Sequence, residues 1–196
     1  MRHQALWGQA AALAIVLTAT APGASGQAGQ TGIGELGAFL GGTFGAGTHV
    51  AGGGSAGIAV SHHGMLLFET SFTPLGNHTI QPWPERSAVQ WSRLWDFALD
   101  AHIRIPVKVR WEPYAIVGSG LLWNTIRTQT VDSDGVAVIR GFSQFNGVFH
   151  TGGGVRYFIG RNWGIRPEIK AIITQHTYTR VSIGIFYVTP AEPEWP

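Results

Sequence analysis

The chain has 196 residues, the length of one domain, and only 12% of them are charged, against roughly 25% in a typical soluble globular protein. Its 13 basic and 11 acidic residues give a net charge of +2, which excludes the strongly basic surface that a nucleic-acid-binding protein needs. The chain contains no cysteine, so disulfide bonds and thiolate metal sites are also excluded. We therefore expect a fold that is stabilised by packing and closure and that exposes little charge to water.

The N-terminus predicts an export signal. Arg2 supplies a positive charge, residues 10–19 form an apolar stretch, and residues 24–26 are small enough for a cleavage site. We expect residues 1–26 to be a signal peptide, after which the exported chain keeps twelve basic and eleven acidic residues. The apolar stretch is shorter than the ~20 residues of a spanning helix, and no later segment is long enough either. An exported chain without such a helix can still cross a bilayer as a closed set of β-strands.

From about Gly34 to Val188 the sequence alternates between apolar and polar residues, most clearly over residues 95–104. One face of that stretch carries Trp95, Phe97, Leu99, Ala101 and Ile103, and the other carries Asp96, Ala98, Asp100, His102 and Arg104. Strand side chains alternate between faces, so this pattern predicts a two-sided sheet. The 28 glycines and eight tryptophans favour a membrane setting, because glycine fits crowded strands and tryptophan prefers the polar boundary of a bilayer.

Eight strands account for the alternation, most of them close to the ~9 to 11 residues that a tilted membrane strand requires. We expect them at residues 34–44, 50–61, 65–73, 93–104, 113–124, 143–158, 164–174 and 179–188. Starting from the periplasm, the external connections are 45–49, 74–92, 125–142 and 175–178, and the periplasmic ones are 61–64, 105–112 and 159–163. Both long loops then lie outside the cell, as expected for this class. The fold prediction is all-β: an eight-stranded antiparallel up-and-down transmembrane β-barrel over residues 27–188, with a short tail at 189–196.

The polar faces of these strands predict a charged lumen. The residues expected there are Glu35, Glu69, Asp96, Asp100, Arg104, Arg156, Arg166, Glu168, Lys170 and Arg180. An eight-stranded barrel is only wide enough for its own side chains, and charges removed from water need partners. Five acids and five bases therefore predict a structural ion-pair network that plugs the barrel.

The apolar faces predict the lipid contact and the aromatic girdles. We expect lipid to contact Trp95, Phe97, Leu99, Ile103, Ile165, Ile169, Ile183 and Ile185. We expect girdle positions at Trp111, Tyr114, Trp123, Tyr157, Trp163 and Tyr187, with Trp95 and Trp123 near the outer rim and the others near the inner one.

Three local motifs suggest bound groups, but their context favours plain structure. Residues 32–37 match the dinucleotide-binding glycine pattern, yet they open a strand rather than a helix and no acid follows about 20 residues on. Residues 132–135 resemble the start of a calcium loop without its later ligands. The adjacent His62 and His63 would point to opposite faces of a strand and fit a solvated turn better. We predict no cofactor, no metal site and no catalytic residue.

A family resemblance emerges from two glycine-rich blocks. Residues 118–120, Gly-Ser-Gly, follow Pro113-Tyr114, and residues 152–157 lead through a tight turn to the acid-bearing strand that ends near Lys170. These blocks resemble the small outer-membrane β-barrel proteins of the OmpA/OmpX and opacity-protein type, which belong among the porin-like families. The resemblance implies an outer membrane of a Gram-negative-type bacterium, a monomer, and folding by the barrel-assembly machinery. Residues 181–188 are similar to the terminal signal of that machinery, although the tail at 189–196 departs from it and is too short for a peptidoglycan-binding domain.

The function predicted is a structural or surface-contact protein, with an extracellular protein or glycan contacting the loops at 74–92 and 125–142. The first loop mixes proline with tryptophan, a composition suited to such contacts. One alternative is a barrel enzyme that modifies lipid, with Asp100 orienting His102 beside Ser182 or Ser143. The other is a soluble lipocalin-like barrel, whose polar face would point outward around an apolar cavity.

Overall fold

The computed structural model describes residues 32–45, 47–83, 86–105, 107, 110–131 and 137–189, with side chains left undescribed at 78–83, 86–87, 131 and 137. The predicted signal peptide, the calcium-like motif at 132–135 and nearly all of the tail at 189–196 lie outside these residues. No helix in the described ranges is long and apolar enough to cross a bilayer.

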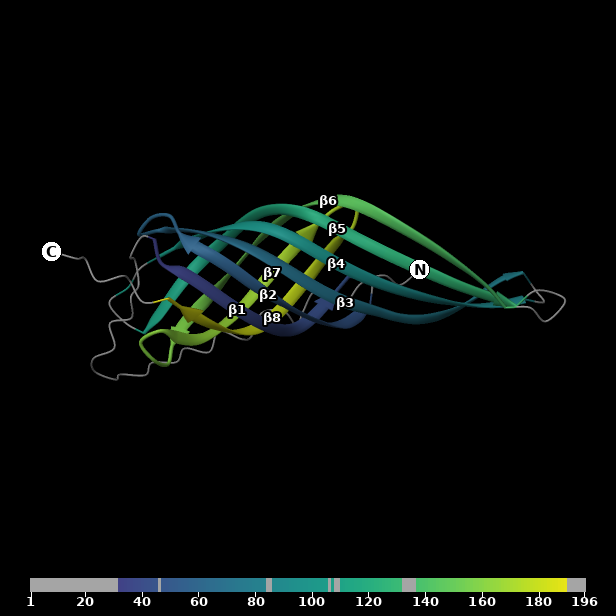
Figure 1. Cartoon of the computed structure of the whole chain (residues 1–196), viewed down its shortest axis with the longest axis horizontal. Coiled ribbons are helices and arrows are strands. Elements are labelled where there is room, and N and C mark those ends of the chain that lie inside the picture. The colour runs from purple at the N-terminus through teal and green to yellow at the C-terminus, as the bar shows by residue number, and fades with distance from the viewer. Residues whose placement is uncertain are drawn as a thin grey trace, which may run out of the picture.

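Eight strands form the molecule. They are β1 (Gly34–Phe44), β2 (Thr48–Ala59), β3 (Gly64–Trp83), β4 (Arg86–Arg104), β5 (Trp111–Val131), β6 (Ala137–Phe158), β7 (Trp163–Ile173) and β8 (Thr177–Val188). Each strand pairs antiparallel with the next, and β1 also pairs with β8, so the sheet closes into a barrel (Figure 1). The predicted eight-stranded antiparallel up-and-down barrel is confirmed.

The alternation of side chains sets the inside and the outside of this barrel. In β7 and β8 exposed and buried residues alternate almost without exception, with Ile183 and Ile185 outward and Ser182 and Phe186 inward. The interior carries charge, whereas the outer wall is aliphatic and aromatic. This arrangement contradicts the lipocalin-like alternative, because that fold would enclose an apolar cavity.

Strands β3 to β6 continue well beyond the other four (Figure 1). The pairing of β4 with β5 runs to Ala88↔Thr130, and that of β5 with β6 runs to Val131↔Ala137. In contrast, β2 stops pairing with β3 at Phe72, and β7 stops pairing with β6 at Phe149. We call the resulting four-stranded sheet, residues 73–83, 86–95, 123–131 and 137–148, the extension.

The prediction of long loops at 74–92 and 125–142 was therefore wrong, because most of these residues are strand. Over these residues the alternation between apolar and polar side chains is weaker than in the rest of the barrel, so the sequence pattern did not indicate strands there. Pro74 is tolerated because β3 is an edge strand at that level, and a register shift between Pro74 and Gly76 marks a bulge at Leu75.

Candidate functional site

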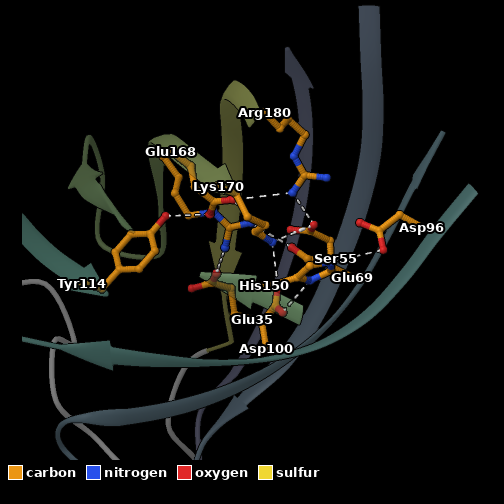
Figure 2. A network of polar contacts seen from close by, with 11 residues as sticks. Glu35, Ser55, Glu69, Asp96, Asp100, Tyr114, His150, Glu168, Lys170 and Arg180 are labelled. Carbon is orange, nitrogen blue, oxygen red and sulfur yellow. Dashed lines mark hydrogen bonds and ion pairs between the residues drawn. The ribbon is translucent and has the colours of Figure 1, made fainter. Parts of the chain in front are cut away.

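The lumen holds a continuous network of charged and polar side chains that draws on all eight strands (Figure 2). All ten residues that the alternation places in the lumen are there, and none is more than 6% exposed: Glu35, Glu69, Asp96, Asp100, Arg104, Arg156, Arg166, Glu168, Lys170 and Arg180. They point inward because residues two apart on a strand share a face, and on each strand these residues alternate with the more exposed ones.

One half of the network is centred on Glu35 of β1. Its carboxylate pairs with Arg156 of β6 and accepts a 2.8 Å hydrogen bond from Nη1 of Arg166 on β7. Arg156 also donates to Oε2 of Glu112 at 2.6 Å. Arg166 donates to the Ser55 hydroxyl at 3.1 Å, which connects β2 to the network.

The other half is centred on Lys170 of β7. Its Nζ donates to Oε1 of Glu69 at 2.9 Å and to Oδ2 of Asp100 at 2.6 Å. Glu69 also pairs with Arg180 of β8. Glu168 lies 3.6 Å from both Nζ of Lys170 and Nη2 of Arg180, and so connects the charges of β7 and β8.

A histidine completes the network. The ring of His150 on β6 has Nδ1 3.1 Å from Oδ1 of Asp100 and Nε2 3.4 Å from Oδ1 of Asp96. An imidazolium carries an N–H on each nitrogen and can satisfy both carboxylates. With His150 charged, the lumen holds six carboxylates and six cations, because Glu112 adds a sixth acid to the five expected from the sequence.

Apolar clusters lie at the two ends of this network. Near the short-turn end Ile33, Phe158, Phe186 and Val188 pack together, and Arg156 lies over the rings of Phe158 and Phe186. Toward the extension a second cluster comprises Leu94, Leu122, Val148 and Ile172, with Leu75 and Tyr178 packed against it. The bulge at Leu75 thus directs an additional apolar side chain toward the interior.

The family follows from a match over nearly the whole chain. Residues 7–189 match the model of the outer membrane protein beta-barrel domain. The chain belongs to this family. No curated protein matches the sequence at a significant level.

Solved structures with this fold come from several Gram-negative bacteria. The N-terminal barrel of OprF from Pseudomonas aeruginosa is 18% identical, with a TM-score of 0.51 over 82% of this chain and 99% of that one. Neisserial surface protein A is 13% identical, with a TM-score of 0.53 over 81% and 97%. Ail, the attachment invasion locus protein of Yersinia pestis, is 10% identical, with a TM-score of 0.51 over 82% and 100%. Like these proteins, this chain is located in the outer membrane.

Aromatic side chains form two belts, one toward each end of the barrel wall, where we expect the membrane boundaries to lie. At the extended end Phe72, Trp95, Trp123 and Phe145 are direct register partners across β3, β4, β5 and β6. At the other end Trp111 pairs with Tyr157, and Trp163 pairs with Tyr187. Short turns lie on the periplasmic side of such barrels, so we expect the extension to project from the cell.

The expected lipid-facing residues are on the outer wall, with Trp95 in the outer belt and the others between the two belts. Leu99, Ile103, Ile169, Ile183 and Ile185 are 54–63% exposed, while Trp95, Phe97 and Ile165 are half-buried by neighbouring side chains. An aliphatic wall with this exposure is what we expect of a surface that contacts hydrocarbon.

The prediction that Tyr114 belongs to the aromatic girdle was wrong. It is 5% exposed, faces the lumen and donates a 2.9 Å hydrogen bond from its hydroxyl to Oε2 of Glu168. Gly154 makes room for it, because a Cβ there would collide with the Tyr114 ring and with the Pro167 carbonyl. Trp111 and Tyr114 are three apart on one strand, so they cannot share a face, and this parity could have revealed the error.

The suggested Asp100–His102 pair is not formed. Both oxygens of Asp100 are used by His150 and Lys170, while the His102 ring stacks on Tyr114 with centroids 4.6 Å apart. Ser143 is exposed on the outer face of the extension, away from the lumen. The geometry proposed for a lipid-modifying enzyme is therefore not assembled. Among the described residues no cluster of three or more metal ligands occurs, and His62 and His63 are exposed in a turn.

Among the residues that hydrogen-bond within the lumen network, sequence reasoning missed Ser55, Glu112, Tyr114 and His150. Glu112 was assigned to a turn, whereas β5 already begins at Trp111. His150 shares its parity with Arg156 on the same strand, and that signal was available from the sequence.

Proposed function

We propose that this outer-membrane barrel is a scaffold with a plugged, charge-paired lumen that presents the extension for contact with an extracellular protein or glycan. The observation that carries the proposal is the extension itself. A barrel that served only to cross the membrane would need no strands of the length of β3 to β6, since ~9 to 11 residues suffice.

The surface of the extension supports a role in contact. Within its described part, Ile139, Phe142 and Phe145 of β6 are 61–66% exposed, and Trp91 of β4 is half-buried. Exposed aromatic and arginine side chains are enriched in contact surfaces. A structure similar in fold, that of Ail, has also been solved in complex with the heparin analogue sucrose octasulfate, which favours an anionic glycan as one partner class.

Removing the extension tests this proposal. In the shortened protein, Asn-Gly turns replace residues 76–92 and residues 126–142. The first turn connects Leu75 to Arg93, whose register partner is Pro74. The second connects the register partners Thr125 and Ser143. We expect the exported protein in lipid nanodiscs to bind at least one of immobilised heparin, laminin and fibronectin, and the shortened protein to lose this binding.

The matched control replaces His62 and His63 by alanine in a periplasmic turn, and we expect its binding to equal that of the unaltered protein. A heat-dependent shift in gel migration shows that each variant still forms a barrel. Equal binding by the shortened and full-length proteins, or binding of none of the three probes by either, would contradict the surface-contact role.

The plugged lumen is supported by the layered interior. Paired charges fill its middle, and apolar clusters close the path at both ends. An eight-stranded barrel leaves little space beyond its own side chains. This predicts that the protein conducts no large, steady ion current.

A further inference from the structure

The described acidic side chains lie only on the inner side of the barrel wall, whereas basic side chains lie on both sides. Every aspartate and glutamate whose side chain the structure describes is buried in the lumen. The charged side chains described outside the lumen are all arginines: Arg93, Arg110, Arg127, Arg140 and Arg161. The described exterior is therefore cationic, although the whole chain is nearly neutral.

Two of these arginines are neighbours on the outer face of the extension. Arg93 of β4 lies opposite Thr125 of β5, and Arg127 is two residues further along β5, opposite Trp91. The register of β4 with β5 runs without a shift, so Arg93 and Arg127 are diagonal neighbours, roughly 7 Å apart at Cβ. Both are exposed, and within the described residues neither has an ion-pair partner.

Like charges at such positions repel each other unless an anion lies between them. The same face offers further groups for binding. Thr125 is opposite Arg93 and two residues from Arg127, and Trp91 and Trp95 flank Arg93 along β4. We call Trp91, Arg93, Trp95, Trp123, Thr125 and Arg127 the basic-aromatic patch.

The position of the patch relative to the membrane indicates which kind of molecule it binds. Trp95 and Trp123 belong to the outer aromatic belt, where hydrocarbon gives way to headgroups. At ~3.3 Å per residue Arg93 lies about 7 Å further along its strand than Trp95, and Arg127 about 13 Å further than Trp123. Because strands in such barrels are tilted, the two guanidinium groups lie within the headgroup layer, on the face that meets lipid lower down.

We propose that the basic-aromatic patch binds the phosphate of an outer-leaflet glycolipid, of the kind built on a phosphorylated glucosamine disaccharide. Arg93 and Arg127 grip the phosphate with paired N–H donors, a geometry that guanidinium groups share with no other side chain. Thr125 donates a further hydrogen bond, and Trp95 and Trp123 contact the acyl chains and sugar at the boundary.

The test counts lipid bound to the purified exported protein. Diphosphorylated glucosamine-disaccharide lipid is titrated into the protein in a non-ionic detergent, and the bound fraction is measured by native mass spectrometry. We expect Arg93→Gln and Arg127→Gln each to weaken binding about fivefold and the double variant about twentyfold, from the usual attraction of one arginine to an anionic lipid surface.

The matched controls are Arg140→Gln and Arg161→Gln. Arg140 is an exposed arginine of the same extension on the opposite face, and Arg161 lies in a periplasmic turn. Both should bind lipid like the unaltered protein, and the dephosphorylated lipid should bind weakly to all. Equal losses in the controls, equal binding of the dephosphorylated lipid, or undiminished binding by the double variant would overturn the proposal. The proposal would also be overturned if binding of a soluble sulfated glycan were lost in the Arg93 and Arg127 variants while binding of the lipid was unchanged.

The two proposals can fail separately. Shortening the extension tests contact with soluble partners, whereas the arginine substitutions leave its strands intact. Gel migration before and after heating shows that each arginine variant is folded.

Discussion

At the scale of single residues, Lys170 illustrates how the buried charges of the lumen depend on one another. Its side chain is fully buried, and its ammonium group holds carboxylates from β3 and β4 to a residue of β7. A buried charge is costly to remove from water, so its stability depends on complete pairing. Removing the cation would leave Glu69 and Asp100 with an uncompensated charge between them.

We expect Lys170→Met to lower the free energy of unfolding by about 3–5 kcal/mol, the usual cost of removing one partner of a buried pair. Guanidinium-induced unfolding in lipid vesicles, followed by tryptophan fluorescence, measures the change. Arg161→Met removes an exposed cation from a turn and should shift stability by less than about 0.5 kcal/mol. If Lys170→Met were as mild as this control, the pairing around Lys170 would be unimportant for stability.

Glycine makes the close packing of this network possible. A Cβ added at Gly118 of β5 would collide with Oδ1 of Asp100 and approach the Leu99 carbonyl at 2.7 Å. Asp100 can therefore turn toward both His150 and Lys170 only because its neighbour on β5 has no side chain.

At the scale of elements, β4 presents charged side chains on its inner face and aliphatic side chains on its outer face. Its inner face carries Asp96, Asp100 and Arg104, while its outer face carries Leu99 and Ile103, each more than half exposed. Their cross-strand partners on β5 continue the same division, since Tyr114 opposite Arg104 faces inward. The faces cannot be exchanged by a local change, because one step in register would invert every side chain.

We expect Leu99→Arg to destabilise the barrel by about 2–4 kcal/mol, because the arginine would enter hydrocarbon near the bilayer centre. The control substitution Thr177→Arg, at an exposed position where β8 begins, should cost about 0–1 kcal/mol. Equilibrium unfolding in vesicles measures both. Two equal costs would show that the outer wall at Leu99 does not meet lipid.

At the scale of the whole molecule, the barrel separates its charges from its membrane surface. The described carboxylates lie in the lumen among basic side chains, apolar clusters lie toward both ends of it, and the outer wall between the aromatic belts is apolar. Closure of β1 onto β8 leaves no free sheet edge within the membrane. Among the described strands, open sheet edges occur in the extension, where β3 and β6 continue past the ends of β2 and β7.

We expect the purified protein to add no large, steady conductance to a planar lipid bilayer, because paired charges and apolar clusters fill its interior. The control is a porin with an open lumen reconstituted at the same protein-to-lipid ratio. A steady current of porin-like size from this protein would contradict the plugged interior.

The sequence alone determined the features that depend on periodicity and composition. The alternation at 95–104 determined the two faces of β4, and the low charge indicated a surface covered by lipid rather than water. The outer-membrane location and the eight antiparallel strands are confirmed. A repeat of two residues is a local property of a strand, so it can be read without knowing what the strand pairs with.

Only the tertiary structure decided how far the strands run and which charges meet. Thr128, Gln129 and Thr130 read as loop because no lipid selects an apolar face there, yet β6 pairs with them as strand. His150 binds Asp96 and Asp100, and Tyr114 binds Glu168, through contacts between strands that lie 50 or more residues apart in sequence. Such pairs depend on the register around the closed barrel, and no single segment of the chain contains that information.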